Sequence, residues 1–232
     1  MSKKAVILLS GGLDSTTILA IAKSQNFECH ALSFAYGQRH IIELESAKKI
    51  AQKFSVTDHK IANIDLRIFG NSALTDEIAV PKHSKVDELD AKNIPITYVP
   101  ARNTIFLSYA LAYCETIDAF DIFIGANAVD YSGYPDCRPT FIKAFNDMAN
   151  LATAKTCDGK NSFKIHAPLV NLSKEQIIEQ GLKLGVDYSL THSCYDPTIQ
   201  NDKILSCGKC DSCLLRLKGF NLAKKTDPIN YI

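Results

Sequence analysis

The chain has almost no net charge and lacks any long apolar stretch. Its 26 Lys and Arg against 25 Asp and Glu leave a formal charge of +1 over 232 residues. Composition therefore gives no electrostatic sign of a direct nucleic-acid partner. No run approaches the roughly 20 apolar residues that cross a bilayer, and the run at 5–9 is shorter than a secretory signal core. We expect a cytoplasmic protein with no membrane partner.

The sequence also lacks the two commoner phosphate loops. No lysine follows Gly12 as a Walker loop requires, and the Gly-x-Gly-x-x-Gly spacing of dinucleotide loops is absent. Repeats and low-complexity tracts are missing too. What is present is Ser10-Gly11-Gly12-Leu13-Asp14-Ser15, directly after the apolar run at 5–9.

This hexamer is typical of a strand that runs through a glycine turn into a helix. Gly11 and Gly12 let the backbone turn tightly and approach a ligand. The N–H groups at the helix start have no intrahelical partner and lie at the positive end of the helix dipole. Hydroxyl groups of Ser10, Ser15, Thr16 and Thr17 add donors. A plain strand-to-helix turn is the alternative, but the full hexamer favours a phosphate or pyrophosphate pocket in a nucleotide-using enzyme.

Periodicity predicts an α/β fold with a parallel sheet and helices on both faces. Apolar runs rich in β-branched residues predict strands at 5–9, 29–33, 56–61 and 122–126, with a weaker one at 163–167. Helical spacing occurs at 44–54, and 105–117 is apolar nearly all round, which suggests a helix covered on both sides. In such sheets ligands bind beyond the carboxyl ends of the strands, where the hexamer lies.

The predicted organisation is one nucleotide-binding domain followed by a small appendage. We expect the domain at 1–185, with an irregular insertion near 62–100, and a C-terminal metal-binding segment packed on it at 186–232. Ser173 and Gln176 form the pattern of a capping box that opens a helix at 174–184, and Gly185 follows as its C-terminal cap.

Four of the eight cysteines have the spacing of a metal site. Cys207, Cys210 and Cys213 are spaced by two intervening residues, and Cys194 lies 13 positions before Cys207. Four thiolates predict one closed, structural Zn²⁺ site per chain. An iron–sulfur cluster is the second interpretation, and a redox pair would leave two cysteines unexplained. The remaining four are expected to be packing residues, with Cys137 doubtful: Cys29, Cys114, Cys137 and Cys157.

Three further segments combine polar and aromatic residues in loop positions. They are 34–40, 98–104 and 125–139, and each follows a predicted strand or precedes a helix on the side of the hexamer. The hexamer resembles the pyrophosphate loop of the N-type ATP pyrophosphatases (the PP-loop superfamily). With the three segments and the cysteines, the chain from residue 6 to about 218 resembles the 7-cyano-7-deazaguanine synthases of queuosine biosynthesis.

This resemblance implies an adenine-nucleotide alpha-hydrolase-like, Rossmann-like fold and an ATP-dependent carbon–nitrogen ligase. The implied reaction converts 7-carboxy-7-deazaguanine and ammonia to 7-cyano-7-deazaguanine through an adenylated carboxylate and then an activated amide. A homodimer is implied as well. Mg²⁺ is expected with ATP, because the Asp14 carboxylate beside a polyphosphate would otherwise be repelled.

Candidate site residues follow from these segments. The expected ATP-binding residues are Leu8, Leu9, Ser10, Gly11, Gly12, Leu13, Asp14, Ser15, Thr16, Thr17 and Ile18. The expected substrate-binding residues are Arg102, Asn103, Asp130, Tyr131, Tyr134 and Asp136. The catalytic candidates are Asp14, Arg102, Asp130 and Arg138. Carboxylates at 130 and 136 suit a guanine-like edge, tyrosines at 131 or 134 suit stacking, and arginines at 102 or 138 suit developing charge.

Alternatives remain for several of these residues. A loop aspartate often caps a turn, and a loop arginine is often a paired surface group. His40 is either a base or structural. Ala35 stands where the family usually has aspartate, so a metal or ribose contact there is in doubt. Two other functions also remain: a tRNA-modifying PP-loop enzyme that adenylates a base carbonyl, and a non-catalytic zinc-ribbon binding module.

Overall fold

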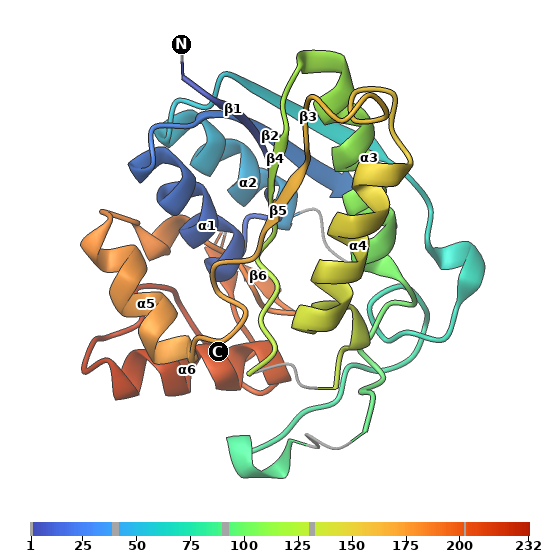
Figure 1. Ribbon diagram of the computed structural model, residues 1–232. Helices are drawn as coiled ribbons and strands as arrows, with labels where there is room; N and C mark the ends of the chain where they lie inside the picture. Colours follow the sequence, from blue (N-terminus) through green and yellow to red (C-terminus); the bar gives the residue numbers. More distant parts are fainter. Residues whose placement is uncertain (1, 39–41, 90–92, 130–132, 202) are drawn as a thin grey trace.

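A five-stranded parallel sheet lies at the centre of the molecule (Figure 1). The computed structural model describes residues 2–38, 42–89, 93–129, 133–201 and 203–232. The strand order is β3-β2-β1-β4-β5, and every neighbouring pair is parallel. The strands are β1 (Lys4–Leu8), β2 (Glu28–Ala35), β3 (Asp58–Asn63), β4 (Asp121–Phe123) and β5 (Lys164–His166). The predicted sheet is therefore confirmed.

Alternation along the central strands produces two apolar layers. Ala5 and Ile7 of β1 face one layer, whereas Val6 and Leu8 face the other. The first layer is covered by α1 (Leu13–Ser24), α2 (Ile42–Lys53) and α5 (Lys174–Lys183), and the second by α3 (Arg102–Ile117) and α4 (Pro139–Leu151). Figure 1 shows α1 and α5 on one side of the sheet and α3 and α4 on the other.

Local sequence signals correctly predicted both ends of α5. The Ser173 side chain accepts a hydrogen bond from the Gln176 N–H, and the reciprocal bond completes the capping box of α5. Gly185 has the left-handed φ of +76° expected of a C-terminal cap. The expectation that the helix at 105–117 is covered on both sides is wrong. Ser108 and Tyr109 of α3 are exposed, because only the face bearing Leu107 and Leu111 packs on the sheet.

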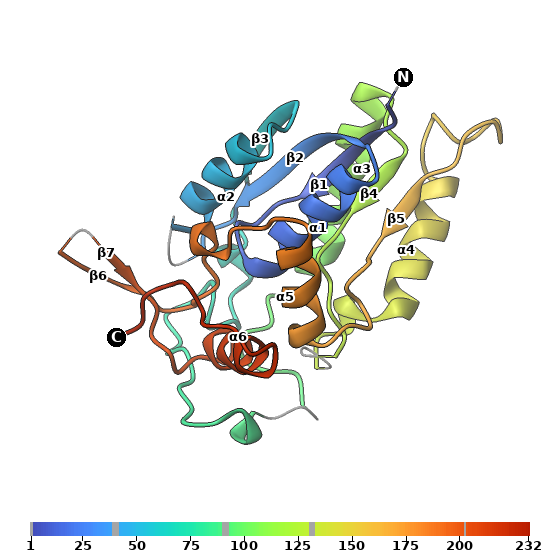
Figure 2. The ribbon, with the colours of Figure 1, turned by 90° about the vertical axis from the view of Figure 1, so that its left-hand side faces the viewer.

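Among its described residues, the segment from 64 to 101 contains only short 3₁₀ turns, and the irregular insertion near 62–100 stays a prediction. The turns are η1 (Arg67–Phe69) and η2 (Val86–Glu88). Sequence reasoning did not predict α4, the turns η3 (Pro135–Cys137) and η4 (Tyr188–Leu190), or the C-terminal elements. These last are the hairpin of β6 (Thr198–Gln200) and β7 (Lys203–Leu205), which projects from the body (Figure 2), and α6 (Asp211–Leu222).

The C-terminal segment shares its packing with the sheet. Tyr188 and Phe220 belong to the same apolar cluster as Ile7 and Ile18. This apolar cluster includes residues on both sides of the predicted boundary between 185 and 186. The division into 1–185 and 186–232 stays a prediction. Within the described residues, no helix combines the length and the apolarity that spanning a membrane demands.

Gly181 of α5 tests this packing. An added Cβ at Gly181 would lie 1.9 Å from the Tyr188 hydroxyl oxygen, which itself is 2.8 Å from the Thr17 hydroxyl of α1. In a solvent-facing helix Gly→Ala is stabilising by about 1 kcal/mol. Here we expect Gly181→Ala to lower the free energy of unfolding by about 1–3 kcal/mol in urea titrations. Glu179→Ala, at an exposed position of the same helix, should change it by less than about 0.5 kcal/mol. A more stable Gly181→Ala protein would contradict the packing.

Candidate active site

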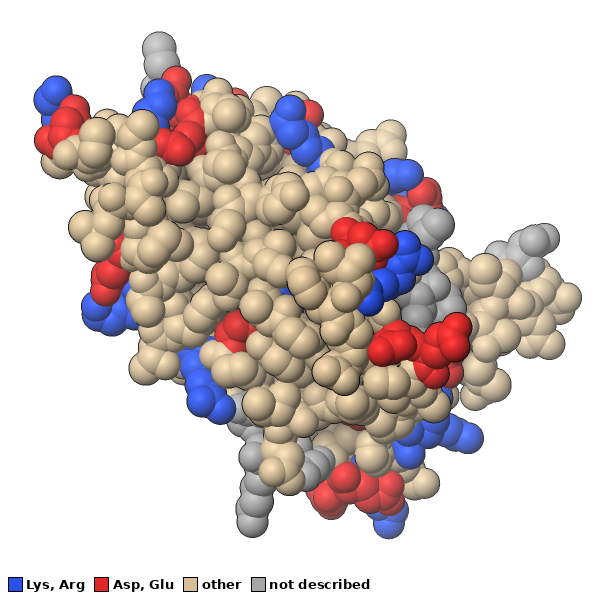
Figure 3. All heavy atoms as spheres, turned by 90° about the vertical axis from the view of Figure 1, so that its right-hand side faces the viewer, with Lys and Arg blue, Asp and Glu red and all other residues tan. Residues whose placement is uncertain are grey.

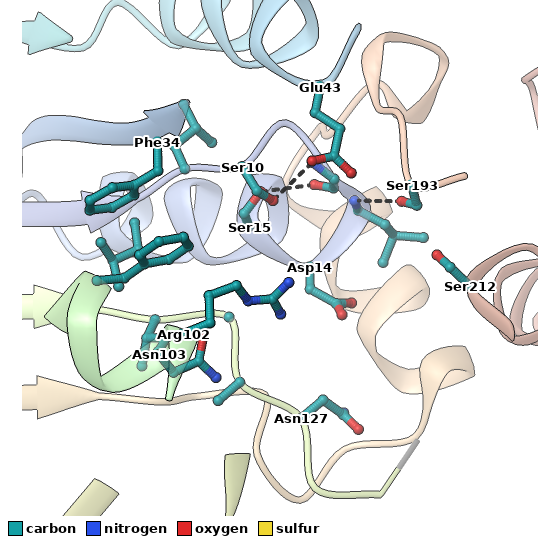
Figure 4. Close-up of a pocket in the computed structure, with 18 of the residues that line it drawn as sticks. Ser10, Asp14, Ser15, Phe34, Glu43, Arg102, Asn103, Asn127, Ser193 and Ser212 are labelled. Atoms are coloured by element: carbon teal, nitrogen blue, oxygen red, sulfur yellow. Dashed lines mark hydrogen bonds between the residues drawn. The ribbon is translucent and has the colours of Figure 1, made fainter. Parts of the chain in front are cut away.

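A cavity of about 240 Å³ opens beyond the carboxyl ends of β1, β2 and β4 (Figure 4). Its walls come from the hexamer, the end of β2, the start of α3, the loop after β4 and the C-terminal segment. Because parallel strands present their carboxyl ends at one sheet edge, segments that are distant in sequence meet there. This is the edge at which the sequence predicted the site.

The hexamer forms the turn between β1 and α1 with its helix start open to the cavity. Gly12 is the N-cap residue and makes no side-chain cap bond. The Leu13 N–H reaches the Ser193 hydroxyl at 3.4 Å, and the Gly12 N–H reaches the Ser10 hydroxyl at 3.3 Å. Gly11 has φ of +87°, and a Cβ there would lie 2.3 Å from the Glu43 carbonyl oxygen. Only glycine fits this turn against α2.

Part of the predicted phosphate set points away from the cavity. The Thr16 hydroxyl donates to the Gly12 carbonyl at 2.8 Å, and the Thr17 hydroxyl donates to the Leu13 carbonyl at 2.9 Å. Such i−4 bonds satisfy hydroxyl groups inside a helix. Gly11, Thr16, Thr17 and Ile18 do not line the cavity, whereas Leu8, Leu9, Ser10, Gly12, Leu13, Asp14 and Ser15 do.

Asp14 is paired with a buried lysine that sequence reasoning missed. The Lys174 ammonium donates to both Asp14 carboxylate oxygens, at 2.8 and 2.9 Å, and Lys174 is only 7% exposed. A cation in the first turn of a helix is unfavourable. The position of Lys174 directly after the Ser173 N-cap was therefore the one sequence sign that this lysine pairs with an acidic group elsewhere. A protein cation thus already offsets the negative charge that prompted the Mg²⁺ expectation.

The start of α3 brings two predicted substrate residues to the opposite wall. Arg102 and Asn103 both line the cavity, and Figure 4 shows the Arg102 guanidinium directed toward the hexamer. Asp136 lies behind them: its carboxylate accepts from the Asn103 N–H at 3.0 Å and it is 6% exposed. Asp136 therefore caps a backbone N–H in the first turn of α3, in line with the capping alternative for a loop aspartate. Arg138 is exposed at the N-cap of α4 and does not line the cavity.

Three predicted residues lie outside the described part of the chain. They are Asp130 and Tyr131, proposed for the substrate, and His40, considered as a base. Their roles stay predictions. Ala35 is described and does not line the cavity, whereas its neighbours Phe34 and Tyr36 do, because successive side chains of a strand face opposite sides.

An aromatic wall adjoins Arg102. Phe34 and Phe106 stack with centroids 3.9 Å apart and planes 2° apart, and the Tyr36 ring lies 5.5 Å from that of Phe106. Tyr134, a predicted stacking residue, lines the same space but is 5% exposed, with its hydroxyl 2.8 Å from that of Thr97. Phe34 and Phe106 escaped prediction because each occupies an ordinary apolar position of a strand or helix.

The four cysteines predicted as metal ligands converge beside this cavity. Their sulfur atoms lie within 4.8 Å of one another. Backbone N–H groups donate to the sulfurs of the turn: Cys207 N–H to Cys194 Sγ at 3.2 Å and Cys210 N–H to Cys207 Sγ at 3.3 Å. Tetrahedral Zn²⁺ with bonds of about 2.3 Å requires sulfurs at this scale of separation. The donor set therefore fits a structural metal site.

The other cysteines follow expectation in part. Cys29 and Cys114 are fully buried packing residues. Cys137 is buried, lines the cavity, and accepts from the Asn103 amide at 3.4 Å, and burial raises the pKa of its thiol to about 11. Cys157 is exposed, so its assignment as a packing residue is wrong.

Glu43, at the start of α2, is a further titratable group of the cavity wall. Burial raises the pKa of its carboxyl to about 7, although the nearby Arg102 charge opposes that rise. Figure 4 shows the side chain directed toward the hexamer. The sequence offered no signal for Glu43, since an acidic residue in the first turn of a helix is commonplace.

Comparison with protein families shows to which family this chain belongs. Residues 4–224 match the model of the family described as queuosine biosynthesis protein QueC. The chain belongs to this family. Curated relatives named 7-cyano-7-deazaguanine synthase agree over nearly the full length. That of Citrifermentans bemidjiense is 61% identical over 231 residues, covering 100% of this chain and 99% of the relative. That of Desulfatibacillum aliphaticivorans is 58% identical over 230 residues, covering 99% and 97%.

Solved structures with a similar arrangement are more distant than these QueC relatives. The NMN synthetase of Francisella tularensis aligns with 83% of this chain and 66% of its own, at 19% identity and a TM-score of 0.49. The NH₃-dependent NAD synthetase of Campylobacter jejuni aligns with 82% of this chain and 67% of its own, at 15% identity and a TM-score of 0.45.

Replacement of Glu43 tests the electrostatics of the cavity. Its carboxyl titrates near 4.5 when unfolded and near 7 when folded, so the folded state binds the extra proton and stability falls as pH rises through that window. Glu43→Gln does not titrate. We expect it to match the wild type near pH 4.5 and to exceed its free energy of unfolding by about 1–3 kcal/mol at pH 8.

The control is Glu45→Gln, an exposed position of the same helix where the Lys48 hydrogen bond lowers the carboxyl pKa. It should show no gain at pH 8. Equal pH profiles for Glu43→Gln and the wild type in denaturant titrations would rule out the raised pKa.

Proposed function

We propose that this chain is an ATP-dependent carbon–nitrogen ligase that converts 7-carboxy-7-deazaguanine and ammonia to 7-cyano-7-deazaguanine. Membership of the QueC family and relatives at 58–61% identity that carry this synthase name support the activity. The observation that carries the proposal is the cavity itself. One end has an open helix start with a buried lysine, and the other has an arginine beside an aromatic wall.

The first half of the reaction activates a carboxylate. A carboxylate is a poor electrophile because its negative charge repels nucleophiles. Its oxygen attacks the α-phosphorus of ATP, the bond from that phosphorus to the bridging oxygen breaks, and pyrophosphate leaves. Ammonia then adds to the carbonyl carbon, a proton is lost, and AMP departs to give the amide.

The second half repeats the activation on the amide. The amide oxygen attacks the α-phosphorus of a second ATP and again releases pyrophosphate. The nitrogen then loses its protons as AMP departs, which breaks the carbon–oxygen bond and leaves the nitrile. Both halves need a protein site that binds the pyrophosphate. The first half also needs a cation that balances the charge of the reacting carboxylate.

The described residues supply these roles. The N–H groups at the start of α1 and the hydroxyls of Ser10 and Ser15 receive the pyrophosphate. The Lys174 ammonium neutralises charge next to Asp14. Arg102 faces the substrate carboxylate, and Glu43, whose carboxyl pKa of about 7 suits proton transfer at neutral pH, accepts a proton from the incoming nitrogen.

Among the other predicted residues, Asn103 and Tyr134 remain substrate contacts because they line the cavity. Asp130 and Tyr131 remain proposals for the guanine-like edge. Asp136 acts by positioning Asn103 rather than by touching substrate. Arg138, exposed at the start of α4, is the weakest of the predicted catalytic residues.

We also propose the identity of the metals. Cys194, Cys207, Cys210 and Cys213 would hold one structural Zn²⁺, which suits four thiolates and supplies no redox chemistry. Mg²⁺ would accompany ATP and shield its phosphate charge.

A homodimer, implied by the family resemblance, is part of the proposal. The face over α3 and α4 carries few charged side chains across its middle (Figure 3). Tyr109 of α3 is 45% exposed and Met148 of α4 is 39% exposed. Burial of such a face between two copies would remove apolar surface from water. The tRNA-modifying and zinc-ribbon alternatives gain no comparable support, because the full-length relatives carry the synthase name.

The activity is tested with purified protein, ATP, ammonium and 7-carboxy-7-deazaguanine. We expect the nitrile by mass spectrometry and substrate-dependent release of pyrophosphate. Asp14→Asn removes the carboxylate that holds the Lys174 ammonium beside the phosphates, so turnover should fall by roughly 100-fold.

The matched control is Asp158→Asn, an exposed carboxylate outside the cavity, which should keep full activity. Metal content should be unchanged in both variants. Absence of nitrile and of pyrophosphate release by the wild type would refute the proposed function.

Metal content provides an independent test. Elemental analysis of the wild type should find about one zinc per chain, and Cys207→Ser should lose most of it, because a structural site needs all four thiolates. Cys157→Ser, at an exposed cysteine outside the cluster, should retain the full amount. Iron in place of zinc would overturn the assignment.

A further inference from the structure

Two helix starts open onto the same cavity. The first belongs to α1 and carries the hexamer. The second belongs to α6, whose N-cap residue Cys210 makes no side-chain cap bond. Ser212, in the first turn of α6, lines the cavity together with Leu13 and Asp14 of α1. The N–H groups of a first helical turn have no intrahelical partners, so each start is a potential anion site.

The Ser212 side chain gives this second helix start a specific donor. Ser212 is 7% exposed, and within the described residues its hydroxyl makes no hydrogen bond, neither to a cysteine sulfur nor to the backbone. Figure 4 shows the hydroxyl directed into the cavity toward the side occupied by Asp14. The hydroxyl lies at the cavity wall, so a bound ligand can supply the hydrogen-bond partner that the protein does not.

The helix starts and the Lys174 ammonium offer N–H donors, and such donors suit an anionic ligand. Lys174 lines the same space, with its ammonium on Asp14. The Asp211 carboxylate, also in the first turn of α6, does not line the cavity and lies 3.5 Å from the His83 ring. Gly12, Leu13 and Asp14, at the start of α1, line the cavity from the other side. A group with several anionic oxygens can contact both helix starts at once.

We propose that the pyrophosphate half of ATP binds between the starts of α1 and α6, with the Ser212 hydroxyl donating to one of its oxygens. This inference rests on the proposed use of ATP. It adds a phosphate-binding residue from the metal-binding segment, remote in sequence from the hexamer.

The placement links the cysteine cluster to ATP binding. Ser212 directly precedes Cys213, and Ser193, whose hydroxyl accepts from the Leu13 N–H, directly precedes Cys194. Two cysteines of the cluster thus each have a neighbour that faces the hexamer. The cluster therefore lies next to both walls of the proposed phosphate site.

The test measures binding rather than turnover. Metal-loaded Ser212→Ala protein is titrated calorimetrically with inorganic pyrophosphate and, separately, with AMP. We expect about tenfold weaker binding of pyrophosphate, unchanged binding of AMP, and unchanged zinc content and melting temperature. Ser212→Thr, which keeps a hydroxyl, should restore most of the pyrophosphate affinity. Ser206→Ala is the matched control, because Ser206 is buried next to Cys207 but does not line the cavity.

Each other outcome overturns the proposal. Unchanged pyrophosphate binding by Ser212→Ala would show that the hydroxyl does not reach the phosphates. Equal weakening for AMP and pyrophosphate, or loss of zinc, would assign Ser212 a general structural role. Failure of the proposed function is distinguishable, because the wild type would then form no nitrile whether or not Ser212→Ala weakens pyrophosphate binding.

Discussion

The ion pair between Lys174 and Asp14 is the contact on which the geometry of the cavity depends. It joins the start of α5 to the first turn of α1, and Gly219 of α6 packs on the lysine stem so closely that a Cβ there would lie 2.5 Å from the Lys174 Cγ. Three helices therefore meet at one buried cation. Removing one partner of such a pair leaves an uncompensated charge, which is more costly than never having built the pair. The pair also fixes the carboxylate of the hexamer before any nucleotide arrives.

A second buried cation ties the C-terminal segment to this centre. The Arg216 side chain of α6 is 2% exposed, donates to the Asp227 carboxylate at 2.7 and 2.9 Å, and reaches the Thr191 hydroxyl at 2.7 Å. The cysteine cluster lies at the start of the same helix and packs against Ala73 and Val80 of the irregular insertion. The insertion and the C-terminal segment thus support each other, and together they form the cavity wall opposite the sheet.

Much of the fold and part of the site were predictable because their causes are local. Apolar periodicity gives strands and helices, the Ser173–Gln176 capping box gives the start of α5, and cysteine spacing gives the cluster, since each depends on residues close in sequence. Orientation and distant packing decided features that no local pattern encodes. Thr16 and Thr17 bond to their own helix instead of facing the cavity, and α3 leaves Tyr109 exposed. Asp136 caps α3 instead of lining the cavity.

The sequence by itself determined the chemistry available: an open helix start for phosphate, four thiolates for a metal, and polar loops at one sheet edge. Membership of the QueC family agrees with that chemistry. Only the tertiary structure decided which groups share the cavity. No sequence motif marks Lys174, Glu43 or Ser212. They become candidate site residues because the packing of α5, α2 and α6 places them around the hexamer. Their burial and their position in the cavity wall depend on that packing, which no local sequence pattern encodes.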